Sequence, residues 1–245
     1  MSDEAISTLA SRLASAGRVT VLTGAGVSAA SGVPTFRGEQ GLWRQFRPED
    51  LATREVFYND PVLAWEWYES RRALISRCEP NAAHHVLARG SRRPGCTLIT
   101  QNVDDLHPRA GAERGGRLHG SIWELSCFDR CPGGSTPWRD ERVPLPTLPP
   151  PCPHCSGDAR PAVVWFGEYL DPAVVAAATA ATACDVFLTV GTSAVVYPAA
   201  GLIQSARARG AFTAEINLES TPASDGVDVS ILGAAETILP LLDAR

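Results

Sequence analysis

The sequence predicts an α/β fold with a mostly parallel sheet, and three observations support this prediction. Short apolar segments rich in β-branched residues alternate along the chain with amphipathic or alanine-rich segments of helical length. Such alternation is typical of parallel strands whose crossover helices cover both faces of the sheet. The length of 245 residues is enough for one large domain with a smaller insert.

The expected elements follow from these segments in order. We expect strands over residues 19–22, 97–100, 163–168, 185–190 and 211–217. We expect helices over residues 3–16, over two parts of 51–78 on either side of Asn59-Asp60-Pro61, and over 81–87, 171–183, 199–209 and 234–242. Asp171-Pro172 has the residue types of an N-cap and a first helical position.

A glycine-rich stretch, TGAGVSAASGVPTFR, follows the first strand and covers residues 23–37. Its glycines permit a sharp turn after which backbone N–H groups can face an anion such as a phosphate. The spacing differs from the G-x-G-x-x-G of ordinary dinucleotide folds, and Gly32 and Pro34 interrupt the following helix, so we expect an extended loop. A plain strand-to-helix turn without a ligand is the alternative that these residues leave open.

Charge and composition restrict the partners. The net charge of -5 argues against nucleic acid, because binding to a phosphate backbone normally needs a basic face. The sequence has no basic and apolar leader of signal-peptide type and no apolar run long enough to cross a bilayer. We therefore expect a cytoplasmic protein that binds no membrane, and we expect a monomer.

Four of the seven cysteines form two close pairs, Cys127 with Cys131 and Cys152 with Cys155. They lie in residues 121–162, a proline-rich segment without a long apolar period. In a reducing compartment, paired spacing of this kind favours metal over disulfides. Four thiolates close tetrahedrally around Zn²⁺ and leave no position for water, so we expect one structural zinc ion. Free buried cysteines are the alternative, and His154 is a possible but less favoured substitute ligand.

Polar residues follow two further strand-like or turn segments. Gln101-Asn102-Val103-Asp104 comes directly after the run 97–100, and Leu118-His119-Gly120 lies beyond a glycine- and arginine-rich turn. In open α/β sheets, ligands gather at the carboxyl ends of the strands, so these residues are candidates for a site. Taken alone, His119 is more simply explained as a structural histidine.

The order and spacing of these motifs resemble the sirtuin family of NAD-dependent protein-lysine deacylases over nearly the whole chain. The matching segments are TGAGVS at 23–28, GVPTFR at 32–37, GLW at 41–43, QNVD at 101–104, LHG at 118–120, the cysteine pairs, VWFGE at 164–168, GTS at 191–193 and Asn217. The first cysteine pair encloses three residues where the family typically has two. The resemblance implies a Rossmann-like NAD-binding domain of residues 1–120 and 163–245, with a helical insert at about 38–90, and a zinc-binding module of residues 121–162.

The resemblance also implies site residues. NAD would contact Gly24, Ala25, Gly26, Ser28, Thr35, Phe36, Arg37, Trp43, Gln101, Asn102, Asp104, Gly191, Thr192, Ser193, Asn217 and Ala235, the last five of which belong to the adenosine side. His119 matches the family's general base, and Asn102 would share in catalysis. A neutral imidazole near pH 7 can take a proton from a ribose hydroxyl of NAD.

The resemblance bears on the substrate as well. Val164, Trp165, Phe166 and Gly167 match the segment that the family pairs with an acyl-lysine peptide through main-chain hydrogen bonds. Tyr68 and Arg71 match the Tyr-x-x-Arg signature of the subgroup that removes negatively charged acyl groups, and Ala52 matches a small residue that widens its acyl pocket. A core aromatic residue beside a solvated arginine is the structural alternative for this pair.

We therefore expect an enzyme that removes succinyl, malonyl and acetyl groups and releases nicotinamide and O-acyl-ADP-ribose. Protein mono-ADP-ribosyl transfer is the main alternative, because it begins with the same loss of nicotinamide. A Rossmann oxidoreductase is a further alternative, but this sequence lacks the G-x-G-x-x-G turn of that class of enzyme. A non-catalytic zinc module would not need His119, Asn102 and Asp104 together.

Overall fold

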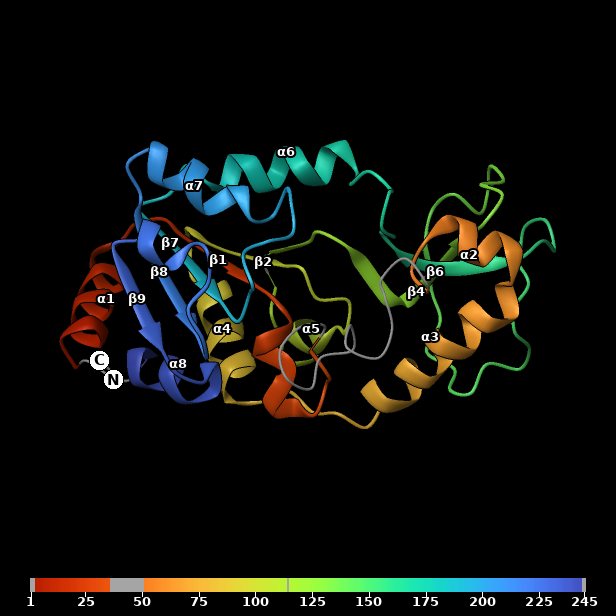
Figure 1. Ribbon diagram of the computed structural model, residues 1–245, viewed down its shortest axis with the longest axis horizontal. Helices are drawn as coiled ribbons and strands as arrows, with labels where there is room; N and C mark the ends of the chain where they lie inside the picture. Colours follow the sequence, from red (N-terminus) through yellow and green to blue (C-terminus); the bar gives the residue numbers. More distant parts are fainter. Residues whose placement is uncertain (1–2, 36–50, 114, 244–245) are drawn as a thin grey trace.

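The computed structural model describes residues 3–35, 51–113 and 115–243 (Figure 1). Its strands are β1 Val19–Thr23, β2 Cys96–Thr100, β3 Gly115–Arg117, β4 Gly120–Cys127, β5 Trp138–Arg139, β6 Ala159–Val163, β7 Val186–Val190, β8 Phe212–Asn217 and β9 Val229–Leu232. Its α-helices are α1 Asp3–Ser15, α2 Arg54–Asn59, α3 Pro61–Ile75, α4 Ala82–Ser91, α5 Leu106–Arg109, α6 Pro172–Ala181, α7 Gly201–Ala208 and α8 Ala235–Asp243. The described residues also include the short 3₁₀ helices η1 Ala25–Ser31 and η4 Ser224–Gly226.

A six-stranded parallel sheet with the order β3-β2-β1-β7-β8-β9 forms the main layer. The central strand β1 pairs in parallel with Cys96–Thr100 of β2 on one side and with Val186–Val190 of β7 on the other. This order confirms the predicted mostly parallel α/β fold and is that of a doubly wound Rossmann sheet. The chain reverses its direction of progress across the sheet between β1 and β7, which is where such sheets bind ligands.

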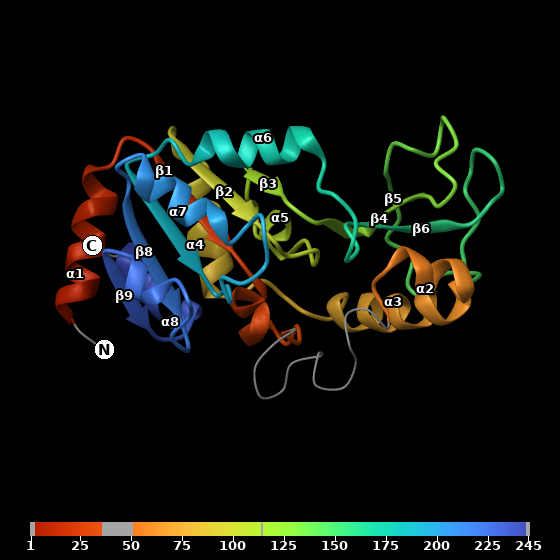
Figure 2. The same ribbon diagram turned by 45° about the horizontal axis from the view of Figure 1, so that its top comes forward.

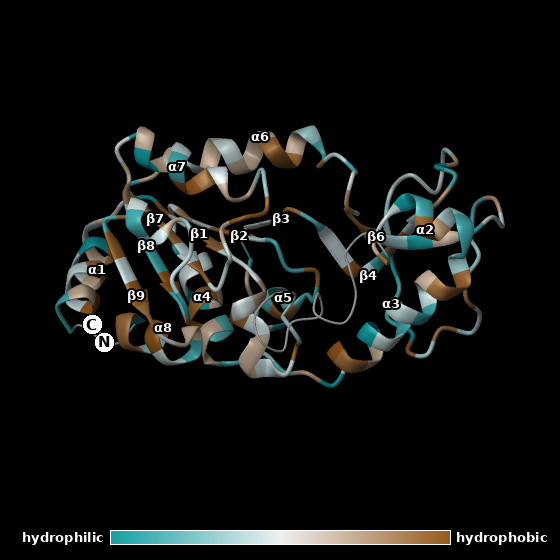
Figure 3. Ribbon diagram, viewed as in Figure 1, coloured by the Kyte–Doolittle hydropathy of each residue, from teal (hydrophilic) through white to brown (hydrophobic). Residues whose placement is uncertain are grey.

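Both faces of the sheet are covered by helices, as the alternating pattern predicts (Figures 1 and 2). On one face, α1, α4 and α8 pack in a core that includes Leu9, Leu87 and Ile238. On the other face, α6 and α7 pack in a core that includes Phe187 and Ile203. Figure 3 colours much of β7 as hydrophobic, and all of its residues are buried, which is typical of a strand covered on both faces.

The cysteine segment and the helices α2 and α3 form a second lobe beside the sheet (Figure 2). Its antiparallel sheet has the order β5-β4-β6. Arg72 of α3 is fully buried and donates to the backbone carbonyls of Ile122, Asp140 and Arg142, at 2.8–3.0 Å. These bonds fix α3 to β4 and to the loop after β5. The boundaries of a separate zinc-binding module stay a prediction.

Most predicted elements are present with ends shifted by up to four residues, but two predictions are wrong. The expected strand 163–168 ends at Val163, and beyond it the described chain has only an isolated bridge between Phe166 and Thr53. A positive φ of 83° at Gly167 turns the chain there. The expected extended loop after Gly24 instead begins as the 3₁₀ helix η1, which stops at Gly32 with a φ of 88°. The short strands β3, β4, β5 and β9 were not predicted.

Candidate functional site

A cavity of about 710 Å³ lies where the parallel strands end. The segments that follow β1, β2, β3, β7 and β8 all contribute to its wall, through Gly24, Gln101, His119, Gly191 and Asn217. The cavity therefore occupies the position that the sheet order predicts for a ligand. It extends toward the second lobe, whose residues line its other end.

Glycines allow the loops after β1 and β7 to cross in contact. A Cβ added to Gly24 or Gly26 would lie 2.8 Å from backbone atoms of Gly191, closer than real side chains approach. A Cβ on Gly191, where φ is 60°, would lie 2.5 Å from the amide nitrogen of Val27. These glycines are thus required by the close packing of two backbone segments at the edge of the cavity.

The same packing changes the expected role of the loop's amides. Gly24 donates to the carbonyl of Val190, Gly26 donates to that of Gly191 at 2.8 Å, and Val27 donates to that of Gly24. These three N–H groups are already satisfied and do not face a phosphate. If the loop contacts an anion, the contact has to come from groups other than these three backbone amides.

Side-chain amides join the strand ends to one another. Gln101 donates from Nε2 to the hydroxyl of Thr192 at 2.8 Å, and Asn217 donates from Nδ2 to the Thr192 carbonyl at 2.9 Å. Asn102 donates from Nδ2 to the carbonyl of Gly24 at 3.1 Å. The polar groups of the cavity wall are therefore held by hydrogen bonds in fixed positions.

A buried network lies behind this wall. The hydroxyl of Ser28 donates to Oδ2 of Asp104 at 2.7 Å and accepts from Asn102 Nδ2 at 3.2 Å. His84 Nδ1 accepts from the amide of Asn81, so its Nε2 carries the hydrogen that points to the Ser28 oxygen at 3.3 Å. Burial lowers the pKa of His84 to about 3 and raises the pKa of Asp104. The network thus contains a neutral histidine.

His119 is held in one orientation at the cavity. Its Nδ1 lies 3.0 Å from the carbonyl oxygen of Gln101, which can only accept, so Nδ1 carries the hydrogen and Nε2 keeps a free lone pair. Burial lowers the pKa of His119, although the Gln101 carbonyl opposes this, and the ring is neutral at pH 7. The arrangement suits a general base.

The second lobe contributes Tyr68, Arg71 and Trp67 from one face of α3, and all three line the cavity. The Arg71 guanidinium lies 5.0 Å from the centre of the Trp67 ring, and the Trp67 ring meets Tyr68 edge-on at 4.7 Å between centroids. Burial lowers the pKa of Arg71, while Tyr68 and Asp104 favour its charged form, and an arginine remains protonated at neutral pH. A cation and a phenol therefore share one end of the cavity.

Two backbone hydrogen bonds attach the segment after β6 to both lobes. The amide of Val164 donates to the carbonyl of His119 at 3.0 Å, and the amide of Phe166 donates to that of Ala52 at 2.9 Å. Val164, Trp165, Phe166, Gly167 and Ala52 all line the cavity.

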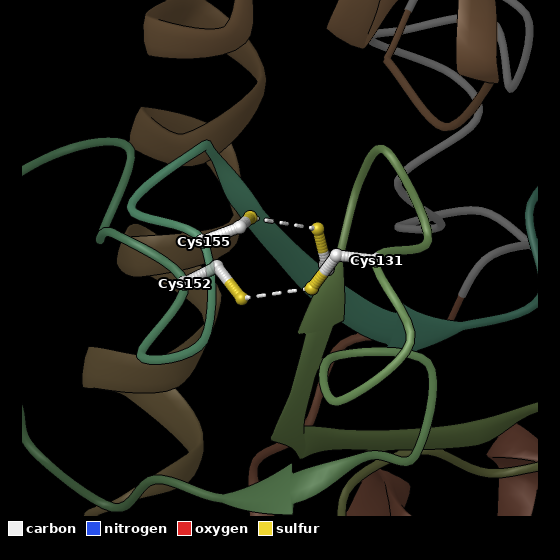
Figure 4. A group of neighbouring side chains, drawn as sticks. Cys131, Cys152 and Cys155 are labelled. Carbon is white, nitrogen blue, oxygen red and sulfur yellow. Dashed lines mark hydrogen bonds between the residues drawn. The ribbon is translucent and has the colours of Figure 1, made fainter.

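The four paired cysteines converge in the second lobe, and Figure 4 shows Cys131, Cys152 and Cys155. Their sulfur atoms, with that of Cys127, all lie within 4.8 Å of one another. The separations of 3.6 Å for Cys127 to Cys155 and 3.8 Å for Cys131 to Cys152 match the spacing of about 3.8 Å in a tetrahedral zinc–thiolate site. The extra residue of the first pair is absorbed at Arg130, whose φ is 54°.

The model of the Sir2 family matches residues 24–198, which is more than half of the chain. This chain belongs to the Sir2 (sirtuin) family. It is 46% identical over 221 residues to an NAD-dependent protein deacylase of Aquifex aeolicus (strain VF5), covering 89% of the sirtuin and 91% of that relative. It is also 46% identical over 239 residues to NAD-dependent protein deacylase 2 of Pyrobaculum aerophilum, covering 96% and 93%.

Solved structures agree with this assignment. The sirtuin superposes on a Sir2 homologue in complex with NAD with a TM-score of 0.90, at 41% identity and with coverage of 97% of this chain and 92% of the other. A Sir2 complex that holds a deacetylated peptide and 3′-O-acetyl-ADP-ribose gives a TM-score of 0.87 at 28% identity, covering 97% and 96%.

The sirtuin is therefore an NAD-dependent protein deacylase with NAD as its co-substrate, and its cysteine cluster fits a structural zinc ion. Gly134 lets its backbone pass close beside this cluster, since a Cβ on Gly134 would lie 2.8 Å from the sulfur of Cys131. Among the residues described, no helix of the sirtuin is long and apolar enough to cross a membrane.

The cavity brings together most of the predicted NAD residues, namely Gly24, Ala25, Gly26, Thr35, Gln101, Asn102, Gly191, Thr192, Ser193 and Asn217. Ser28 and Asp104 are buried behind it. Ala235 starts α8 in the core and does not line the cavity, so its contact with NAD stays a prediction. Phe36, Arg37 and Trp43 lie outside the described residues.

Sequence reasoning missed several residues of the site. The cavity wall also includes Trp67 and the loop 218–222 after β8, and the buried network includes His84. Trp67 lies four residues before Arg71, a helical spacing that could have indicated their contact. No signal in the sequence placed the loop 218–222, because β9 itself was not predicted.

Proposed function

We propose that this sirtuin removes succinyl and malonyl groups, as well as acetyl groups, from lysine side chains of proteins. The observation that supports the proposal most is that Tyr68 and Arg71 line the same cavity as Ala52. A terminal carboxylate on the acyl group would accept hydrogen bonds from the phenol and the guanidinium, and Ala52 leaves room for the longer acyl chain.

Arg71 places a guanidinium beside aromatic side chains at the cavity, where an acyl carboxylate would reach it. Its neighbours at this end of the cavity include the aromatic side chains of Trp67 and Tyr68, and burial lowers its pKa. A hydrogen bond between ionised groups contributes about 1.5–3 kcal/mol, more than a neutral one. An acetyl group ends in a methyl and gains none of this, so the site favours charged acyl groups.

In the proposed reaction His119 is the general base. NAD supplies the electrophilic C1′ of its nicotinamide ribose and the adjacent ribose hydroxyl. The free Nε2 lone pair of neutral His119 would take the proton of that hydroxyl, while the Nδ1–H continues to donate to the Gln101 carbonyl. Asn102 and Asp104, held through Ser28, would order the nicotinamide end of the cavity.

The substrate peptide would pair with the backbone of residues 164–167. This segment leaves the β4–β6 pairing at Val163 and lines the cavity between His119 and Ala52. Pairing through main-chain groups gives affinity with little dependence on the side chains of the substrate. Many acylated proteins would therefore be accepted.

The test compares peptides that differ only in the lysine modification, each incubated with NAD. We expect O-acyl-ADP-ribose from succinyl, malonyl and acetyl peptides. Arg71→Met should lower kcat/KM for the succinyl peptide about a hundredfold, equivalent to about 3 kcal/mol, while acetyl-peptide activity changes severalfold at most. Arg54→Met is the matched control, because Arg54 stacks on Phe128 at 4.2 Å in the same lobe but does not line the cavity.

Two outcomes would contradict the proposal. Equal losses with succinyl and acetyl peptides in Arg71→Met would show that Arg71 does not bind the acyl carboxylate. Transfer of ADP-ribose to protein, with no O-acyl-ADP-ribose formed, would favour the mono-ADP-ribosyltransferase alternative.

A further inference from the structure

The hydroxyl of Tyr68 has a specific donor within the protein. The indole Nε1–H of Trp165 donates to the Tyr68 oxygen at 2.8 Å. Both side chains are buried, with exposed fractions of 4% for Tyr68 and 2% for Trp165. Burial raises the pKa of Tyr68 to about 12, against the lowering effect of Trp165, so the phenol keeps its proton throughout the physiological range.

We propose that Trp165 is a positioning residue for acyl-group selection, because its indole N–H occupies the acceptor side of the Tyr68 oxygen and leaves the Tyr68 proton for the acyl carboxylate. This inference rests on the proposed desuccinylase and demalonylase function. It assigns Trp165 a role in choosing the acyl group, separate from the backbone contact that its segment makes with the peptide.

The direction of the Tyr68 proton follows from hydrogen-bond chemistry. A phenol oxygen carries one proton and accepts through its lone pairs, whereas an indole N–H can only donate. The Tyr68 O–H bond therefore cannot point at Trp165. No acceptor for this proton is present among the residues that the structure describes, and Tyr68 lines the cavity.

Trp165 is itself held in place on several sides. The Arg160 guanidinium lies 3.3 Å from the centre of the indole ring, and Arg160 forms an ion pair with Glu168. Glu168 also accepts the backbone N–H of Trp165 at 2.9 Å, and the ring of Phe57 packs 5.3 Å from the indole centre. A cation above an indole face attracts electron density from the ring and makes the N–H a stronger donor.

These contacts predict which substrates depend on Trp165. A carboxylate oxygen accepts from the Tyr68 O–H and from the Arg71 guanidinium, whereas an acetyl methyl accepts from neither. Loss of the indole N–H frees the Tyr68 proton to turn away from the cavity. The effect should therefore appear with succinyl and malonyl peptides and be nearly absent with acetyl peptides.

The simpler alternative is that Tyr68 merely satisfies a buried indole N–H. In that case replacing Trp165 would destabilise the lobe and lower every activity by the same factor. Trp65 provides the matched control, because its Nε1–H donates to the carbonyl of Ala159, also at 2.8 Å, from an equally buried ring in the same core. Trp65 does not line the cavity.

The experiment is a double-mutant cycle of Trp165→Phe and Tyr68→Phe, with Trp65→Phe beside it, in the full zinc-loaded chain. We expect Trp165→Phe to lower kcat/KM for the succinyl peptide about tenfold more than kcat/KM for the acetyl peptide, mainly through KM. In the Tyr68→Phe background, the same substitution should have no further effect on desuccinylation. Trp65→Phe should change both activities by one common factor.

Additive losses in the cycle, or equal losses with both peptides, would overturn the role of Trp165. If Trp165→Phe does not fold, 3-benzothienylalanine at position 165 keeps the bicyclic ring and removes only the N–H. The same comparison of succinyl and acetyl peptides then tests the role of Trp165. Absence of desuccinylation in the wild-type protein is a different result, since it would reject the proposed function itself.

Discussion

The zinc cluster offers a sharp test at Gly134, beside the four sulfurs. An added Cβ there would lie 2.6 Å from the Cβ of Cys127, 2.8 Å from the sulfur of Cys131 and 2.9 Å from that of Cys152. Ordinary contacts are about 3.5–4.0 Å, so Gly134→Ala forces two ligands outward by roughly 0.7 Å. Zinc–ligand distances in proteins lie within about 0.2 Å of their usual values, so a shift of this size disturbs the site.

Overpacking of this kind costs about 1–3 kcal/mol, and we expect Gly134→Ala to bind zinc about 10- to 100-fold more weakly than the wild-type protein. Competition with a zinc-binding dye measures the affinity. Gly133→Ala is the control, because its Cβ would meet only the exposed ring of His154, which can rotate away. Wild-type zinc affinity in Gly134→Ala, with loss in Gly133→Ala, would refute the four-cysteine geometry.

Two further predictions concern histidines. His119→Gln should lower the deacylation rate about 10²- to 10⁴-fold without unfolding the protein. The rate of the wild-type protein should fall only as pH drops below 6.5, because a base with a lowered pKa stays deprotonated above that value. A loss of rate that begins at higher pH would contradict this role of His119. Burial lowers the pKa of His84 to about 3 and that of His107 to about 4, so below pH 6.5 both take up protons on unfolding. The free energy of unfolding is therefore at its full value above pH 6.5 and falls as pH drops toward 4. His107 alone accounts for up to about 3 kcal/mol of this loss. Urea unfolding from pH 7 to pH 4.5 measures this, and His107→Phe should flatten the curve.

Local patterns predicted the main sheet well, because buried parallel strands need continuous apolar runs and their helices need clear caps. The Asp171 side chain, for example, accepts from the amide of Ala173 at 2.7 Å and starts α6 where expected. The strands β3 and β9 lacked such runs. Gly115 and Gly116 of β3 have no side chains to pack, and a Cβ on Gly115 would lie 1.9 Å from the carbonyl oxygen of Leu98. The contact with the neighbouring strand β2 explains Gly115, whereas a Cβ on Gly116 would meet nothing within 4 Å.

In the site too, the sequence does not determine where individual side chains lie. Arg71 and Arg72 are adjacent and chemically identical, yet Arg71 lines the cavity whereas Arg72 is buried among backbone carbonyls of the second lobe. Sequence motifs distinguished them only through the family resemblance. The glycines after β1 line the cavity, but the structural reason for them is the contact with Gly191, which lies far away in the sequence.

The proposed catalytic base and the proposed acyl pocket lie on different parts of the protein, and their alignment depends on a few backbone bonds. His119 follows the parallel sheet, whereas Tyr68 and Arg71 belong to α3, which Arg72 fixes to β4 of the cysteine lobe. Residues 164–168 connect the two, since Val164 donates to His119 and Phe166 donates to Ala52. Zinc stabilises the loops at the ends of β4 and β6, and β6 leads directly into this segment. A zinc ion without any contact to substrate can thereby affect both acyl selection and the position of the base.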